Sequence, residues 1–184
     1  MKKNVLKSLA CFMLLCMAWS CNDEGETTMS NPEAEARDFR EKSENVWEGE
    51  LGAEQEDGEL VITASRSDLY EEFGRLLAKK GNMTKLSSLD IQIREADNDP
   101  SDNAYFLIAS GTDLQTGMTT SIGVMLNKTS GFFYLGHPLT DGDPLDVTCR
   151  GCPSGCFLKY YVIGKARVPY CDSAGCGPDC DKQE

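Results

Sequence analysis

Six cysteines in the last 36 residues form the clearest chemical pattern of the sequence. They follow the spacing C-x2-C-x3-C and, 14 residues later, C-x4-C-x3-C. Disulfides, a metal site or redox-active thiols could each use such a pattern. The second cluster lacks the C-x2-C knuckle of a zinc ribbon, and the run does not match ferredoxin spacing, so disulfides are favoured. The sequence leaves the pairing open among Cys149, Cys152, Cys156, Cys171, Cys176 and Cys180.

Two acidic segments share the pattern D-x-D-P-x-D. Clustered carboxylates in loops are the oxygen ligands that Ca²⁺ takes in proteins. Neither segment is an EF-hand loop, because the third Asp is displaced and no Glu closes the loop at the required spacing. An acidic turn built around the proline is therefore favoured over a calcium site. The weak calcium candidates are Asp97, Asp99, Asp102, Asp141, Asp143 and Asp146.

His137 is the only histidine of the chain, so it is the only candidate imidazole base. It could work with Asp141 or Asp143 in acid–base chemistry. The sequence holds no G-x-S-x-G, H-E-x-x-H, P-loop or G-x-G-x-x-G motif. A histidine in a surface turn is the favoured interpretation, and we expect no catalytic residue and no cofactor.

The N-terminus has the layout of a secretory signal. Lys2, Lys3 and Lys7 precede an apolar stretch from Leu9 to Trp19, and no acidic residue occurs before Asp23. The apolar stretch is shorter than the roughly 20 residues that a membrane-spanning helix needs. Residues 1–20 are therefore predicted to be a signal peptide.

The residues around the end of this signal carry a resemblance to a known class. Ala18-Trp19-Ser20-Cys21 resembles a bacterial lipobox, although the usual lipobox has Leu in place of Ala18 and a smaller residue in place of Trp19. The following Asn22-Asp23-Glu24-Gly25-Glu26 resembles the acidic surface-export signal of Bacteroidota lipoproteins. The resemblance covers only these first 26 residues. It implies a lipid on Cys21 and a lipid-anchored protein of the outer membrane, exposed at the cell surface.

The number of cysteines supports a lipid on Cys21 independently. Of the nine cysteines, Cys11 and Cys16 leave with the signal, and seven remain. An odd cysteine in an exported chain pairs between molecules or stays free. If Cys21 carries lipid, the remaining six can all form disulfides, in keeping with an oxidising compartment.

Acidic residues dominate the segment after the signal. The chain of 184 residues has a net charge of −12, which argues against nucleic acid as a partner. Between residues 22 and 59 there are 14 acidic and three basic residues, and large apolar residues are sparse. Such a segment cannot bury enough surface to offset its ordering entropy. We therefore predict a flexible tether over residues 21–59, ahead of a domain at 60–148.

Hydrophobic periodicity predicts one helix and a series of strands in that domain. The helix opens at Asp68, carries Leu69, Phe73, Leu76 and Leu77 on one face, and stops at Gly81. Residues 60–62, 89–93, 122–126 and 132–135 are predicted strands. Residues 104–109 form a continuous apolar run, so this strand should be covered on both faces. The predicted fold class is α+β, with the helix packed on an antiparallel meander.

The cysteine-rich tail is predicted to be a small module at residues 149–184. The run Phe157–Ile163 is suited to a strand, and residues 164–167 could turn the chain back towards Val168-Pro169-Tyr170. A hairpin of this size cannot build a sufficient core alone, so covalent links make physical sense.

These features favour a surface-anchored lipoprotein that acts as a binding or structural module. Its expected partners are a membrane, through the lipid, and a protein or glycan ligand that the sequence does not identify. One alternative is an accessory hydrolase using carboxylates such as Asp141 and Asp143. Another is a protease inhibitor that inserts a loop such as Gly164–Val168.

Overall fold

The structure of the protein, a computed structural model, describes residues 45–184 apart from residues 115, 138, 154, 155, 174 and 184. Its central element is an eight-stranded sheet in which every pairing is antiparallel. Its strands are β1 (Gly52–Glu54), β2 (Leu60–Ile62), β3 (Ser88–Ala96), β4 (Asp99–Thr112), β5 (Thr119–Thr129), β6 (Phe132–Leu135), β7 (Asp146–Gly151) and β10 (Asp181–Gln183). Two short 3-10 turns, η2 (Val46–Glu48) and η3 (Gly177–Asp179), complete the unit with helix α2 and a separate two-stranded hairpin.

Strand β5 organises the sheet because it pairs with three other strands. Strand β4 lies along one side of β5, and β3 lies beyond β4. On its other side, β5 pairs with β7 through residues 119–124 and with β6 through residues 126–129. The connection from β6 to β7 leaves the sheet at this point, beside Met125. The two strands therefore part from each other along β5.

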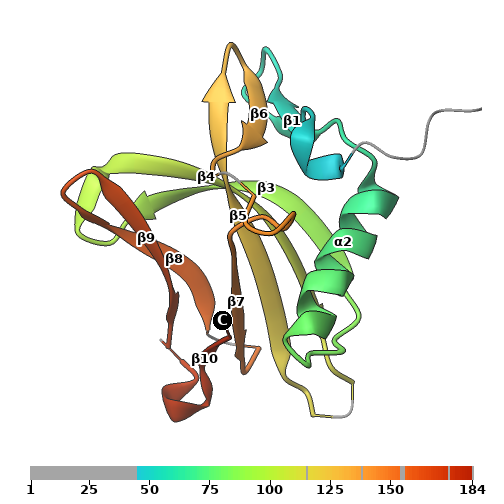
Figure 1. The fold of residues 1–184 in the computed structure, drawn as a ribbon. Coiled ribbons are helices and arrows are strands. Elements are labelled where there is room, and N and C mark those ends of the chain that lie inside the picture. Colours follow the sequence, from blue (N-terminus) through green and yellow to red (C-terminus); the bar gives the residue numbers. More distant parts are fainter. Residues whose placement is uncertain (1–44, 115, 138, 154–155, 174, 184) are drawn as a thin grey trace, which may run out of the picture. The chain divides into compact units, whose positions relative to one another are not determined.

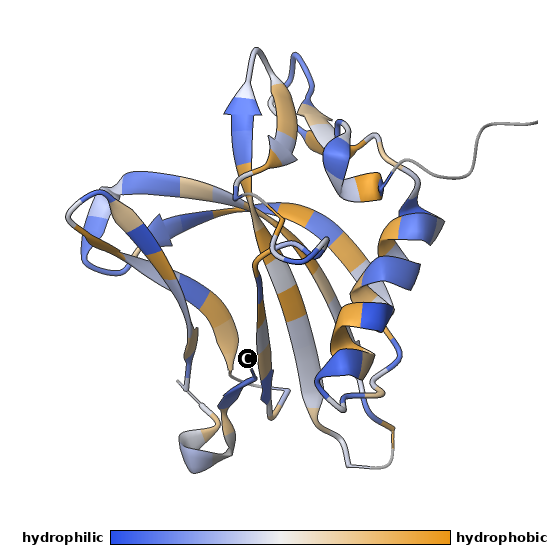
Figure 2. Ribbon diagram, in the orientation of Figure 1, coloured by the Kyte–Doolittle hydropathy of each residue, from blue (hydrophilic) through white to orange (hydrophobic). Residues whose placement is uncertain are grey.

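Helix α2 (Arg66–Lys79) covers one face of this sheet (Figure 1). Its cap is the Ser65 side chain, which accepts a hydrogen bond from the Asp68 backbone N–H, so the helix begins two residues before the predicted Asp68 cap. Its end is as predicted: Gly81 has a φ of 71°, and the Asn82 N–H donates to the Leu77 carbonyl. The hydrophobic side of the helix faces the sheet in Figure 2.

The other face of the sheet is covered by the hairpin of β8 (Phe157–Ile163) and β9 (Ala166–Asp172) (Figure 1). This confirms the hairpin expected in the tail. Its Leu158 packs close to β5, where Gly123 leaves the necessary space. A Cβ at Gly123 would lie 2.9 Å from Leu158 Cδ1, so the Leu158 side chain would have to shift to admit a larger residue there.

Two hydrophobic cores result, one on each face of the sheet. On the helix side, α2 packs against residues such as Leu107 and Val124, while on the hairpin side Phe106 and Met125 meet β8. Alternate residues of β4 therefore enter different cores. This confirms that the apolar run at residues 104–109 is covered on both faces.

The folded unit begins earlier than predicted. Trp47 in η2 is only 2% exposed and Leu51 is fully buried, and both belong to the helix-side core. Strand β1 pairs with both β2 and β6. The tether predicted for residues 21–59 therefore does not reach residue 59, because the aromatic and apolar residues of this acidic segment fold onto the sheet. Its earlier part, including Cys21, lies outside the described residues.

The predicted boundary at residue 149 also needs correction. Strands β7 and β10 belong to the eight-stranded sheet, and Cys149 is a fully buried residue of β7. The disulfide-rich module is thus joined to the main sheet and shares a core with it.

The acidic segment at residues 97–102 is only partly a loop, because Asp99 and Asp102 already belong to β4.

Candidate functional site

Three disulfides link the two cysteine clusters. They join Cys149 to Cys171, Cys152 to Cys176 and Cys156 to Cys180, so each cysteine of the first cluster pairs with its counterpart in the second. The disulfide prediction is confirmed, and the pairing that the sequence left open is now assigned. Because all six sulfurs are bonded in pairs, they are not metal ligands in this state.

Asp102 holds the middle of the hairpin against β4. Tyr160 is fully buried, and its hydroxyl donates to the carbonyl and to a carboxylate oxygen of Asp102, over 2.7 and 2.8 Å. Arg167 donates to both carboxylate oxygens, over 2.8 and 3.1 Å. The Arg167 guanidinium and then the Tyr160 hydroxyl lower the pKa of Asp102, whereas burial raises the pKa of Tyr160. The hairpin is therefore fixed both by the disulfides and by this polar cluster.

A cavity of about 480 Å³ lies between β9 and the sheet, where β6 and β7 part along β5. Its walls come from β4, β5, β7, β9, the connection from β6 to β7, and the ends of α2 and β10. Its apolar lining residues are Phe106, Gly123, Met125, Pro144, Leu145, Val147, Val168 and Pro169. Its other lining residues are Lys80, His137, Thr140, Asp146, Arg167 and Lys182.

Positive charge outweighs negative charge in this lining. Among the described lining residues, Lys80, Arg167 and Lys182 are cationic, and Asp146 is the only carboxylate. Lys80 is held at the cavity by Asp146 at 2.7 Å and by the Gln183 carbonyl at 3.1 Å. Lys80 and Asp146 are 14% and 8% exposed, so their pair is shielded from solvent and fixed in position. The cavity thus combines an apolar wall with a cationic rim.

A second hollow continues from the cavity towards the tip of the hairpin. Its volume is about 350 Å³, and it shares Met125, His137 and Arg167 with the cavity. The lining of this hollow also includes Asn127 and Asp102. The two spaces therefore adjoin each other at these three residues.

The six calcium candidates are spread over separate contacts. Asp97 accepts from Tyr170 and lies 3.5 Å from the Lys159 ammonium, while Asp99 accepts from Ser101. No group of three or more His, Cys, Asp or Glu in the described part of the chain could hold a metal ion. Four of the six carboxylates contact cations of the chain itself: Asp97, Asp102, Asp143 and Asp146.

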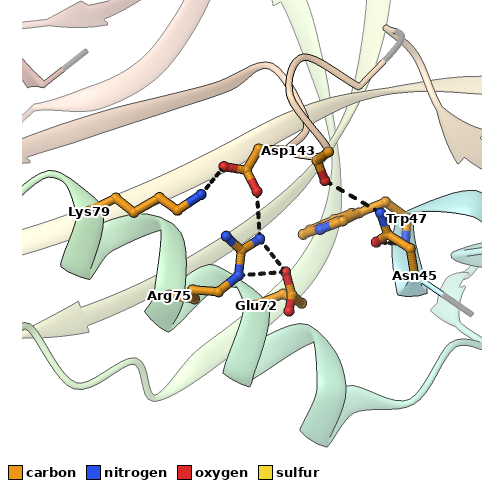
Figure 3. Close-up of polar contacts among 7 residues, drawn as sticks. Asn45, Trp47, Glu72, Arg75, Lys79 and Asp143 are labelled. Carbon is orange, nitrogen blue, oxygen red and sulfur yellow. Dashed lines mark hydrogen bonds and ion pairs between the residues drawn. The ribbon is translucent and has the colours of Figure 1, made fainter. Parts of the chain in front are cut away.

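Asp143 illustrates this use of the acidic residues (Figure 3). It accepts from Arg75 at 2.6 Å and from Lys79, both on α2. These hydrogen bonds, with that from Arg75 the stronger, lower the pKa of Asp143. Asp143 therefore fastens the loop between β6 and β7 to the helix. Asp141 lies nearby in an exposed turn with a φ of 53°.

His137 lines both the cavity and the adjoining hollow. From sequence, Asp141 or Asp143 was considered as the carboxylate partner of His137. Neither of these residues lines the cavity beside His137. A pair of carboxylates converging in a cleft is the arrangement that glycosidase chemistry requires. Among the described residues of the cavity lining, Asp146 is the only carboxylate, and its charge is paired with Lys80.

Sequence patterns singled out His137 and Asp146 of the cavity lining, but as a candidate base and a weak calcium candidate. The three cations of the lining were not indicated, and Arg167 was interpreted only as part of a turn. Lys182 carries no motif at all. These residues meet because the hairpin folds back over the sheet and the C-terminal strand pairs with β7. No local spacing pattern in the sequence indicates that these residues lie close together.

Comparisons with protein-family models, with curated proteins and with solved structures found no match to this chain. Over the residues described, no helix is long and apolar enough to span a bilayer.

Proposed function

We propose that this protein is a surface lipoprotein, anchored through a lipid on Cys21, whose folded unit binds an anionic amphiphile in the cavity between β9 and the sheet. The anchoring part rests on the N-terminal signal and its lipobox-like end. The disulfide pairing supports it, because six of the seven cysteines after the signal pair among themselves. Cys21 is then the remaining one.

The observation that carries the binding function is the composition of the cavity. A volume of about 480 Å³ falls in the range of about 300–1,000 Å³ that is typical of small-molecule sites. An apolar wall is suited to a hydrocarbon body, whose transfer from water is favourable by about 0.8 kcal/mol per CH₂ group. The three cations of the lining are suited to a carboxylate or phosphate group of the ligand, which Lys80 and Arg167 would contact while also bound to Asp146 and Asp102.

The arrangement of the lining residues favours binding of an anionic amphiphile over the two other functions considered from sequence, a hydrolase and a protease inhibitor. A hydrolase with glycosidase-type chemistry would need a second carboxylate beside Asp146, whereas Asp102 in the adjoining hollow is bound to Arg167 and Tyr160. A substrate-like inhibitory loop needs an extended backbone that can pair with a protease, but residues 163 and 166 pair with each other across a two-residue turn. Arg167, next to that turn, is bound to Asp102.

Matched ligands test the binding function. We expect decanoate to bind the purified folded unit, and decanol to bind about tenfold more weakly, because the alcohol lacks the charge that the rim cations attract. Calorimetric titration of each ligand below its micelle concentration measures the difference. Equal affinities for the acid and the alcohol would contradict the charge argument.

A matched pair of variants places the ligand. Leu145 is 55% exposed at the rim of the cavity, so Leu145→Glu should leave the fold intact. It removes an apolar contact and adds a negative charge, and we expect decanoate to bind at least about tenfold more weakly. Leu114 is 96% exposed and does not line the cavity, so Leu114→Glu is the control with unchanged affinity. If both variants bind decanoate equally, this cavity is not the site.

Metabolic labelling tests the anchor. Cells that express the full chain and are fed an alkyne-tagged fatty acid should incorporate the label, and Cys21→Ala should lose it completely. A label that persists in the variant, or none in the original chain, would contradict lipidation at this cysteine.

A further inference from the structure

A separate hollow lies between the start of β8 and the face formed by β3, β4 and β5. Its volume is about 210 Å³, below the range of drug-sized ligand sites. It shares no described lining residue with the cavity under β9. The lining residues are Gln92, Arg94, Ile108, Ser110, Thr119, Ser121, Pro153, Cys156, Phe157 and Leu158.

Arg94 differs from the arginines of the chain that are paired with carboxylates, such as Arg75 and Arg167. Its Nη2 donates to the side-chain oxygen of Gln92 over 2.6 Å, and its Nε is buried and finds no acceptor among the described residues. Arg75 and Arg167, by contrast, donate to carboxylates at 2.6 and 2.8 Å. No such ion pair is formed by Arg94 within the described part of the chain. Burial accordingly lowers the pKa of Arg94, whereas carboxylate contacts raise the pKa of the other two.

A half-buried guanidinium without a counter-ion is costly to the folded protein. Taking a cation out of water is unfavourable unless an anion or several hydrogen-bond acceptors replace the lost hydration. The neutral Gln92 amide supplies one acceptor only. An anion entering the hollow would supply the missing charge and the missing acceptors together.

The other polar residues of the hollow are hydrogen-bond donors suited to an oxyanion. Ser110 and Ser121 face each other as register partners on β4 and β5, and Thr119 lies two residues from Ser121. Hydroxyl groups can rotate to donate to an incoming oxygen. Among the described residues that line the hollow there is no carboxylate that would repel an anion. Beside them, Phe157, which is 47% exposed, offers apolar surface to the rest of a ligand.

We propose that this hollow binds a small oxyanion-bearing ligand, held by the Arg94 guanidinium and by the hydroxyls of Ser110, Thr119 and Ser121. The anionic group is a carboxylate, as in an acidic sugar, or a tetrahedral sulfate or phosphate. A planar guanidinium can meet both kinds of anion through two parallel hydrogen bonds. The site does not depend on the amphiphile-binding cavity, so either can exist without the other.

Thermal-shift and calorimetric titrations at constant ionic strength test the proposal. The probes are sodium sulfate, sodium phosphate, acetate and glucuronate, with uncharged glucose as the match for glucuronate. We expect at least one anion to bind and stabilise the protein, and glucose to have no effect. Binding of sulfate or phosphate alone identifies a tetrahedral anion, and binding of glucuronate or acetate alone identifies a carboxylate. Failure of every anion, or an equal response to glucose, would overturn the proposal.

Two substitutions connect binding to Arg94. We expect Arg94→Gln to weaken anion binding at least about tenfold, whereas Arg66→Gln should change it less than about twofold. Arg66 is a suitable control because it is exposed on α2 and donates to the Leu89 carbonyl, away from the hollow. Gln92→Glu keeps the shape of the side chain and gives Arg94 a carboxylate within the protein. This variant should melt at a higher temperature than the original chain and no longer respond to the anion.

The Gln92→Glu variant keeps the test decisive even if Arg94→Gln fails to fold. Unchanged anion binding by Gln92→Glu, or equal weakening by Arg66→Gln and Arg94→Gln, would show that the anion binds elsewhere.

Discussion

Replacing Cys149 and Cys171 together by alanine is expected to lower the free energy of unfolding by about 3 kcal/mol. The two residues are 22 positions apart, and their bond joins β7 of the main sheet to β9 of the hairpin. Without the bond, the unfolded chain gains the freedom of an open loop of that length. Urea unfolding in the absence of reductant measures the change.

A second disulfide provides the matched control. Cys152 and Cys176 are 24 residues apart, so the loop entropy of their bond is nearly the same. Each pair has one buried and one partly exposed cysteine, but Cys149 is fully buried whereas Cys176 is 8% exposed, so the first substitution leaves the more enclosed space in the core. We therefore expect the Cys149/Cys171 variant to lose about 1 kcal/mol more than the Cys152/Cys176 variant. A loss below about 1 kcal/mol for the first pair would contradict its role in holding the hairpin.

Replacing Trp47 by alanine is expected to cost about 3–5 kcal/mol of folding stability. Its indole ring is 2% exposed and packs edge-on against the Phe73 ring of α2, with ring centroids 5.2 Å apart. This residue lies in the acidic segment that composition alone predicts to be a tether. In a tether the substitution would have no effect on unfolding, so the experiment separates the two interpretations.

Two further variants refine the Trp47 test. The buried indole N–H finds no acceptor among the described residues, so Trp47→Phe keeps the ring contact and removes an unsatisfied donor. We expect it to be more stable than Trp47→Ala by about 2 kcal/mol. The exposed Leu114→Ala should change stability by less than about 0.5 kcal/mol. Equal unfolding curves for Trp47→Ala and Leu114→Ala would place Trp47 outside the core.

Local pattern predicted the secondary structure and the fold class well. The apolar positions of α2 recur at helical spacing, and alternation marks strands such as residues 122–126 within β5. The continuous run at residues 104–109 indicated a strand with two covered faces, because both sides of it had to be apolar. These signals lie within a few residues of one another, so the sequence displays them directly.

The parts that sequence did not predict depend on contacts between distant segments. The disulfide pairing follows from how β9 returns beside β7. The boundary at residue 59 was wrong because a few buried residues, Trp47 and Leu51, outweigh a strongly acidic composition. In the sequence, Arg94 alternates with apolar residues, which is the pattern of an exposed strand residue. In the structure, the hairpin lies over this strand and partly buries the guanidinium. The described cavity residues likewise come from seven different segments.

Acidic residues also proved to have different roles in different places. Asp102, Asp143 and Asp146 fix loops and strands through cations of the chain, whereas their shared spacing indicated acidic proline turns, with a calcium site as the weaker alternative. Around the cavity under β9 the balance is reversed, and cations outnumber carboxylates among the described lining residues. The local balance of charged residues in this lining therefore favours an anionic ligand, whereas the net charge of −12 of the whole chain would suggest a cationic partner.

Photo-crosslinking tests the proposed function most directly. A decanoate analogue with a diazirine on its hydrocarbon chain would be irradiated with the folded protein, and the labelled peptides identified by mass spectrometry. We predict labels on residues 144–147 and 167–169, which line the cavity, and their loss when unmodified decanoate competes. Labels on other exposed apolar residues, such as Phe132 and Met83, or labels that decanoate does not displace, would contradict a binding site under β9.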